Sequence, residues 1–230
     1  MSIRNALVAE VVKQWKWFGE DEGTGNKTIK GKRKETVEPY SSRVADYWLA
    51  IGSTEYDRLV RAFAKNTGRL DGTINLAWSA AFISYCMQMG GAGTAFPYGP
   101  GHATWIVKSI ANKQNGRLNA ALVGYKPGEI PLSVGDLIGK PRVSGVTYGN
   151  AVSKGWFESH SDIVVEVNTA KRSAFVIGGN VGQSVSRVKV AITADGKLND
   201  SAGWIVHIQN NIQAGNAVAA ARAGREVLVG

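Results

Sequence analysis

The order of two hydrophobic patterns along the chain restricts its fold more than any other sequence feature. Near the N-terminus apolar residues recur every three or four positions, as at Leu7, Val11, Trp15 and Phe18, and this is the spacing of one helix face. After Gly116 the pattern changes to short β-type runs separated by turn residues. Helical segments followed by strands predict an α+β domain.

The predicted elements divide the chain of 230 residues into three parts. Residues 1–41 hold one helix and a basic loop that we expect to be mobile. Residues 42–210 hold the α+β domain, and the Ala-rich residues 211–230 form a terminal helix or a frayed end. The further predicted helices are 42–52, 53–68, 76–89 and 102–114, and the predicted strands are 134–139, 162–167, 173–178, 184–192 and 203–208.

The charge balance of the chain indicates an anionic partner. It has 27 Lys and Arg residues against 18 Asp and Glu residues, and this net charge of +9 suits nucleic acid, acidic lipid or a cell-wall polymer. We recognise no nucleic-acid-binding module, so nucleic acid is not the expected partner. The basic stretch at Lys30, Lys32, Arg33 and Lys34 could dock an anion, although charge runs are more often simply solvated.

Hydropathy predicts neither a membrane span nor a secretory leader. No apolar run approaches the ~18 residues that cross a bilayer, and the N-terminus lacks the apolar core of a signal peptide. We therefore expect synthesis in the cytoplasm, no integral membrane contact, and delivery by other machinery if the protein acts outside its cell. Cys86, the single cysteine, has no partner for an internal disulfide and is expected in the core.

A predicted hairpin brings a histidine opposite an asparagine. If the two strands pair symmetrically about Ala170, Val167 faces Ser173 and His160 faces Asn180. Residues directly opposite each other on an antiparallel pair share a face, with Cβ atoms about 4.5–5.5 Å apart. The asparagine amide would then orient the imidazole of a general base. A purely structural pair, hydrated at the open end of the hairpin, fits the same spacing.

Ser79 lies near the start of the predicted helix 76–89. A nucleophile at that point benefits from the helix dipole and from free backbone N–H groups. A serine at a helix start is more commonly a cap, so position alone does not identify a nucleophile. Cys86 is the alternative nucleophile, but it lies nearly two turns further along the helix, about 10 Å along the axis.

Three motifs occur in the order found in one group of hydrolases: Trp78-Ser79, Ser159-His160 and Gly178-Gly179-Asn180, with Gly135-Asp136-Leu137 similar to the turn before their first core strand. Over roughly residues 3–200 the chain resembles a bacterial domain of unknown function that is related to the papain-like NlpC and CHAP cell-wall hydrolases. The resemblance implies a papain-like core, in which N-terminal helices pack on a small antiparallel sheet, and makes 42–210 the hydrolase domain.

The resemblance also implies a function, a peptidoglycan amidase or endopeptidase that cleaves an amide bond in the stem peptide or cross-bridge of murein. Ser79 occupies the position of the usual cysteine nucleophile, His160 that of the base, and Asn180 that of the orienting group. Four further residues are candidates for substrate binding in the cleft: Trp78, His102, Trp105 and Asp162.

Several alternatives stay open at this point. His102 shares a helix face with Trp105 and becomes the base if the strand assignment is wrong, and Asp162 is the alternative orienting group for His160. A serine hydroxyl is less nucleophilic than a thiolate, and three explanations for Ser79 stay open. Ser79 is a working serine nucleophile, an engineered replacement of a cysteine, or the sign of a catalytically inactive wall-binding or adaptor domain.

Metal and phosphate motifs are missing from the sequence. The three histidines are scattered, there is no CxxC or HExxH, and no phosphate-binding glycine loop precedes a helix. We expect no metal and no cofactor.

The expected partners are peptidoglycan and, as the resemblance implies, an immunity protein or the secretion or phage machinery. Such a phage lysin or interbacterial effector toxin would act in the periplasm or on the cell wall.

Overall fold

A mixed seven-stranded sheet organises the part of the chain that the structure, a computed structural model, describes, residues 2–199 and 203–214. Its order is β1-β8-β7-β6-β5-β9-β4, and every neighbouring pair is antiparallel except β1 and β8. The strands are β1 (Asp21–Glu22), β4 (Leu122–Tyr125), β5 (Leu137–Pro141), β6 (Ser159–Asn168), β7 (Ser173–Gly178), β8 (Ser186–Ala191) and β9 (Val206–Asn210). A separate hairpin pairs β2 (Thr28–Ile29) with β3 (Lys32–Arg33).

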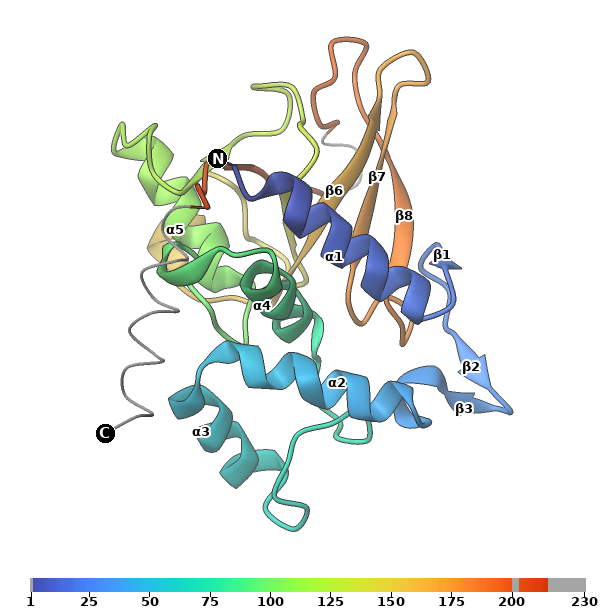
Figure 1. The fold of residues 1–230 in the computed structure, drawn as a ribbon. Coiled ribbons are helices and arrows are strands. Elements are labelled where there is room, and N and C mark those ends of the chain that lie inside the picture. Colours follow the sequence, from blue (N-terminus) through green and yellow to red (C-terminus); the bar gives the residue numbers. More distant parts are fainter. Residues whose placement is uncertain (1, 200–202, 215–230) are drawn as a thin grey trace.

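Helices cover one face of this sheet. They are α1 (Arg4–Trp17), α2 (Tyr40–Trp48), α3 (Ser53–Phe63), α4 (Ser79–Met89), α5 (Ala103–Gln114) and the short α6 (Ala151–Lys154), with 3₁₀ turns η1 (Lys34–Thr36), η2 (Leu49–Ile51) and η3 (Gly93–Ala95). In Figure 1, α1 crosses in front of β6 and β7, α4 lies behind the end of α2, and α2 and α3 form the lower part of the molecule. Helix α4 contacts α1, α2, β6 and β7, and α5 contacts β4 and β9.

The α+β class predicted from the sequence is confirmed, and most predicted elements exist with shifted ends. Helix α4 begins at Ser79, three residues later than predicted, and α3 ends at Phe63, five residues early. Strand β4 was not predicted. The predicted mobile loop instead contains β1, which joins the sheet beside β8, and the β2–β3 hairpin. Of the predicted C-terminal part, residues 215–230 lie outside the described residues.

One residue of the basic stretch, Lys34, is buried and forms an ion pair inside the fold. Lys34 is buried, its ammonium lies 2.7 Å from the Asp21 carboxylate, and it also donates to the carbonyl oxygen of Phe18. The Ser184 hydroxyl donates to the same carboxylate at 2.5 Å. The expectation that this charge run is exposed to solvent is therefore wrong for Lys34. The Lys34–Asp21 pair instead holds the segment after α1 together, and Ser184 ties Asp21 to the turn before β8.

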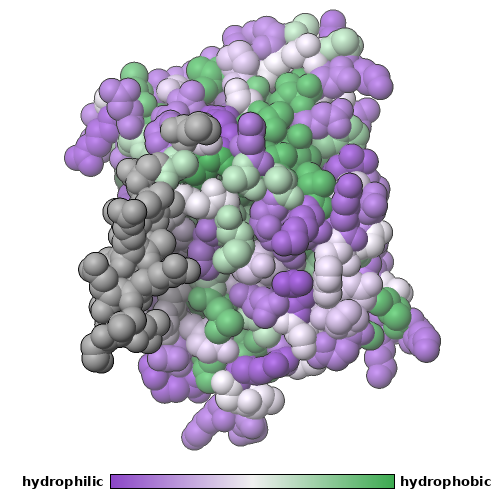
Figure 2. Space-filling view, viewed as in Figure 1, coloured by the Kyte–Doolittle hydropathy of each residue, from purple (hydrophilic) through white to green (hydrophobic). Residues whose placement is uncertain are grey.

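Sheet pleating separates two hydrophobic clusters. Leu137, Ile163 and Ile177 belong to the large core beneath the helices, whereas Ile138 and Val164 belong to a smaller cluster on the other face. Successive side chains of a strand point to opposite faces, and β5, β6 and β7 therefore contribute to both clusters. Figure 2 shows polar and apolar residues interspersed over the surface on the side viewed in Figure 1. Among the described residues, no helix is both long and apolar enough to cross a membrane.

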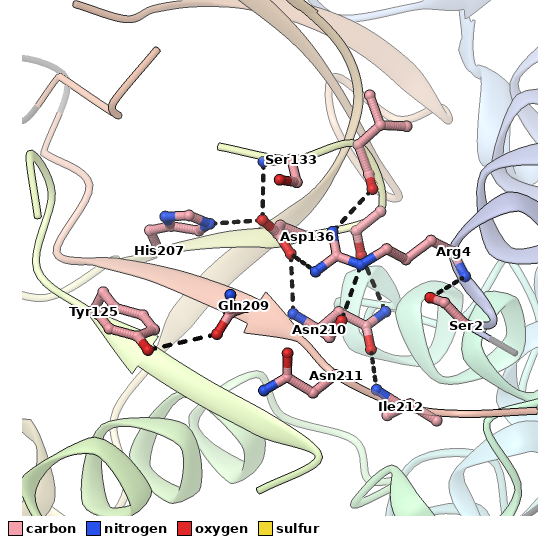
Figure 3. Close-up of polar contacts among 12 residues, drawn as sticks. Ser2, Arg4, Tyr125, Ser133, Asp136, His207, Gln209, Asn210, Asn211 and Ile212 are labelled. Carbon is pink, nitrogen blue, oxygen red and sulfur yellow. Dashed lines mark hydrogen bonds and ion pairs between the residues drawn. The ribbon is translucent and has the colours of Figure 1, made fainter. Parts of the chain in front are cut away.

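A buried carboxylate joins the N-terminal helix to the centre of the sheet (Figure 3). One oxygen of Asp136 lies 2.6 Å from the Arg4 guanidinium and accepts from the Asn210 backbone N–H at 3.0 Å. The other oxygen accepts from the Ser133 backbone N–H at 2.9 Å and from His207 Nε2 at 2.8 Å. Asp136 is 1% exposed, so its carboxylate depends on these partners and not on water for its hydrogen bonds.

We predict that Asp136→Ala lowers the free energy of unfolding by roughly 3–5 kcal/mol, because it leaves a partly buried guanidinium and an imidazole without their anion. The matched control is Asp195→Ala, which removes an exposed ion pair with Lys197. This control should leave the free energy of unfolding nearly unchanged, because exposed ion pairs contribute little to stability. Urea denaturation of the two variants measures the difference, and equal effects would contradict a central role for Asp136.

Candidate functional site

Ser79 and His102 meet where two helices begin. Ser79 is the first residue of α4, His102 is the N-cap of α5, and Ser79 Oγ lies 2.8 Å from His102 Nε2. The first helical hydrogen bond of α4 runs from the Phe82 N–H to the Trp78 carbonyl. The backbone N–H groups of Ser79 and the next two residues therefore have no acceptor within the helix, and they form a partial positive charge beside the hydroxyl.

The second nitrogen of His102 reaches the sheet. His102 Nδ1 lies 2.7 Å from the hydroxyl oxygen of Ser161 on β6, and the Trp105 indole N–H donates to the same oxygen at 2.9 Å. A histidine accepts a proton at Nε2 only when Nδ1 carries the ring proton. In that tautomer Nδ1–H donates to Ser161, and the free lone pair on Nε2 faces the hydroxyl of Ser79.

Burial keeps His102 neutral. Its side chain is 3% exposed, and desolvation, followed by the nearby His160 and Arg142, lowers the pKa of His102 well below the ordinary histidine value. A neutral imidazole can accept a hydrogen bond or a proton throughout the neutral pH range. No carboxylate among the described residues bonds to this ring.

His160 belongs to a separate group of residues. Arg142 Nη2 lies 3.2 Å from His160 Nδ1, and a guanidinium can only donate, so Nδ1 is the acceptor. The ring proton of the neutral imidazole is then on Nε2, which donates to Asp162 Oδ1 at 2.7 Å. The His102 and His160 ring centroids are 5.2 Å apart.

The pleat of β6 explains why Ser79 bonds to His102 rather than to His160. Ser161 and Ile163 lie on the face that the helices cover, so the alternation of the strand turns His160 and Asp162 toward the opposite face. The described hydrogen bonds give Ser79 no contact with His160. The expected Ser79–His160 pair is therefore replaced by Ser79–His102, the alternative base.

Asp162, and not Asn180, accepts the hydrogen bond from His160. The hairpin begins as predicted, with Ile163 facing Ile177, but a bulge between Val164 and Glu166 shifts the remaining pairs, so that Val167 faces Ala174 and not Ser173. At the other end, β7 stops at Gly178. Asn180 therefore lies in a turn, with a φ of 54°, and does not pair with His160.

Asn180 instead belongs to a buried polar group around Glu35. With its amide nitrogen facing Glu35, Asn180 donates to Oε2 at 3.0 Å and its oxygen accepts from the Trp78 backbone N–H at 3.3 Å. The Trp78 indole N–H donates to the same Oε2 at 2.7 Å. Burial raises the pKa of Glu35, while the Trp78 hydrogen bond and the charge of Arg33 oppose the shift.

Both tryptophans predicted to contact a substrate, Trp78 and Trp105, are buried side chains that hydrogen-bond to other residues of the site. Trp78 is 1% exposed and stacks against Tyr47 and Phe18, and Trp105 is fully buried. Their indole N–H groups hold Glu35 and Ser161 respectively. Both rings therefore pack as core residues, and their predicted contact with a substrate stays a prediction.

Two cavities flank Ser79, and Arg142 lines both. The first, of about 390 Å³, is lined mainly by polar residues: Asn26, Arg33, Glu35, Ile74, Asn75, Leu76, Ala77, Ser79, Arg142, Asn180, Gly182 and Gln183. The second, of about 340 Å³, also contains His102 and is largely apolar, with Leu76, Ala80, Pro100, Phe157 and the 70% exposed Trp156. A third cavity of about 210 Å³ holds His160 and Asp162.

Sequence reasoning did not single out Ser161, Arg142 or Glu35. Ser161 directly follows His160, the predicted base. Because side chains alternate along a strand, Ser161 is expected on the face opposite to that of His160. Arg142 directly follows β5, whose residue Lys140 pairs with His160. Glu35 lies in the loop predicted to be mobile, and no sequence signal connects it with the site.

Comparison with known proteins gives one match. No curated protein and no solved structure matches the chain. One family, described as "Uncharacterized protein conserved in bacteria (DUF2272)", matches residues 4–214. This range includes α1, both helices that carry the Ser79–His102 pair, and every strand of the sheet. The chain therefore belongs to this bacterial DUF2272 family.

Proposed function

We propose that this protein is a serine hydrolase that cleaves an amide bond in murein peptides, with Ser79 as nucleophile and His102 as base. The observation that carries the proposal is the 2.8 Å contact between Ser79 Oγ and His102 Nε2 at the start of α4. A nucleophile within hydrogen-bond reach of a base, beside free backbone N–H groups and between two cavities, has the parts needed for acyl transfer.

The reaction proceeds in two halves. Ser79 Oγ attacks the substrate carbonyl carbon while its proton passes to His102 Nε2, and the backbone N–H groups of Ala80 and Ala81 stabilise the oxyanion. His102 then returns the proton to the leaving amine, and the carbon–nitrogen bond breaks to give an acyl-serine. A water molecule repeats the sequence, with His102 as its base, and releases the carboxylic acid and free Ser79.

Two observations support murein as the substrate. The net charge of +9 attracts the chain to an anionic cell wall. The order of the Trp78-Ser79, Ser159-His160 and Gly178-Gly179-Asn180 motifs resembles that of papain-like NlpC and CHAP hydrolases. We also propose that the domain is related to the papain-like hydrolases and that it acts on the wall after export or lysis. In this proposal His160 positions Arg142.

A catalytically silent wall-binding domain is the second candidate function. It is favoured by the surroundings of His102, which lacks a carboxylate partner among the described residues and lies near Arg142. Both features disfavour the imidazolium that hydrolysis requires. In this case the Ser79–His102 hydrogen bond would only hold α4 against α5.

We predict that Ser79→Ala and His102→Gln each lower the release of murein fragments by at least about 100-fold, because each removes one partner of the proton transfer. Chromatography of digested, purified murein measures this. The matched control is Ser53→Ala, an exposed serine that also begins a helix, and it should leave turnover unchanged. Turnover that is absent from the unsubstituted protein as well would overturn the hydrolase proposal.

The pH dependence of kcat/KM should report the neutral form of His102. Since burial lowers the pKa of His102, the ring stays neutral as the pH falls through 6.5, and activity is lost only on passing the lower pKa. We predict nearly equal kcat/KM at pH 7 and pH 6 and a decline in more acidic buffer. An acid limb centred at or above pH 6.5 would contradict the assignment, and NMR titration of the histidine rings provides the independent check.

A further inference from the structure

We infer that the polar cavity beside Ser79 is a subsite for a carboxylate group of the substrate, bound by Arg33 and Arg142. The inference rests on the proposed function, because it concerns an acyl substrate whose scissile carbonyl reaches Ser79. It adds a chemical requirement that the Ser79–His102 pair does not impose, namely a free negative charge on the substrate at one side of the scissile bond.

Arg142 is held at the junction of the cavities with most of its donors unused. Its backbone N–H donates to the Glu158 carbonyl at 2.8 Å, and Nη2 donates to His160 Nδ1. Among the described residues no acceptor faces Nε or Nη1 of Arg142. Its side chain lines the cavities on both sides of Ser79, so the unused N–H groups are available to a ligand bound there.

Arg33 is oriented by the buried group around Glu35. Its Nη1 lies 3.5 Å from Glu35 Oε1, and the other oxygen of Glu35 is occupied by Trp78 and Asn180. The Arg33 side chain is 45% exposed, whereas that of Glu35 is 6% exposed. The guanidinium therefore borders the open part of the cavity, and the carboxylate lies beneath it as a support.

The charge and the donors of this cavity fit a carboxylate. Two guanidinium groups line it against one carboxylate, and that carboxylate is already hydrogen-bonded. Apart from Ser79, the remaining polar side chains of the lining are amides, from Asn26, Asn75, Asn180 and Gln183. A planar guanidinium matches a carboxylate through paired N–H···O bonds, and such charge-assisted bonds are stronger than neutral ones.

The cavity on the other side of Ser79 differs in chemistry. It is lined mainly by apolar side chains, including Phe157 and the exposed ring of Trp156. Arg142 lies between the two cavities. A substrate that spans Ser79 is therefore bound in one direction, with its carboxylate in the polar cavity and a less polar portion against Trp156.

Binding to the inactive Ser79→Ala chain tests this inference without turnover. The probes are stem peptides released from purified murein and the same peptides with their carboxylates converted to carboxamides, titrated by calorimetry. We expect the conversion to weaken binding about tenfold or more, since it removes charge-assisted hydrogen bonds. Arg33→Gln and Arg142→Gln should weaken binding of the free acid similarly and leave the carboxamide unaffected. Arg61→Gln, an exposed arginine on α3, is the control and should change neither.

The outcomes separate this inference from the proposed function. Equal affinity for acid and carboxamide in the Ser79→Ala chain overturns the subsite, whatever the turnover. Arginine-dependent binding together with no turnover by the unsubstituted chain supports the subsite and rejects the hydrolase. In an active enzyme, Arg33→Gln should raise KM at unchanged kcat, whereas a fall in kcat for both probes would show that the arginines stabilise the oxyanion and would overturn the subsite. Arg33→Gln keeps Glu35 bonded to Trp78, so the test stands if Arg142→Gln fails to fold.

Discussion

The close approach of two helices to one face of the sheet is the constraint on which the site depends. A Cβ atom on Gly179 would lie 2.4 Å from Phe82 Cβ of α4, and one on Gly124 would lie 2.8 Å from the backbone nitrogen of Ile110 in α5. Only glycine fits at such distances. Helix α4 thus rests against the residue that follows β7, and α5 rests against β4. The start of α4 and the N-cap of α5 meet beside Ser161 of β6, where Ser79 lies within hydrogen-bond distance of His102.

The electrostatics of the site connect the proposed reaction with the proposed substrate. Proton transfer from Ser79 creates an imidazolium on His102, which burial and the nearby positive charge of Arg142 disfavour. A substrate carboxylate paired with Arg142 would offset that charge at the moment of attack. The substrate carboxylate would then have two effects. It would select the substrate, and it would make His102 a stronger base by offsetting the charge of Arg142. In this proposal His160 and Asp162 position Arg142. Asp162 accepts a hydrogen bond from His160 Nε2, and His160 Nδ1 accepts one from the Arg142 guanidinium where the cavities meet.

The fold class could be predicted from the sequence because helix and strand patterns are local. Helices α4 and α5 and strands β6 and β7 all overlap the segments predicted for them. Local patterns could not predict which face of β6 the helices cover, and this choice decides between Ser161 and His160. The bulge after Val164 and the early end of β7 likewise depend on tertiary packing. For His102, the helix face that it shares with Trp105 was a usable signal, since both side chains meet at Ser161.

The central claim, that His102 activates Ser79, is tested most directly by covalent labelling. A fluorophosphonate forms a stable bond with an activated serine hydroxyl, and mass spectrometry of the digested protein locates it. We expect a label on Ser79 that is lost in His102→Gln and retained in His160→Gln. A label that survives His102→Gln and disappears in His160→Gln, or no label on Ser79 at all, would contradict this claim.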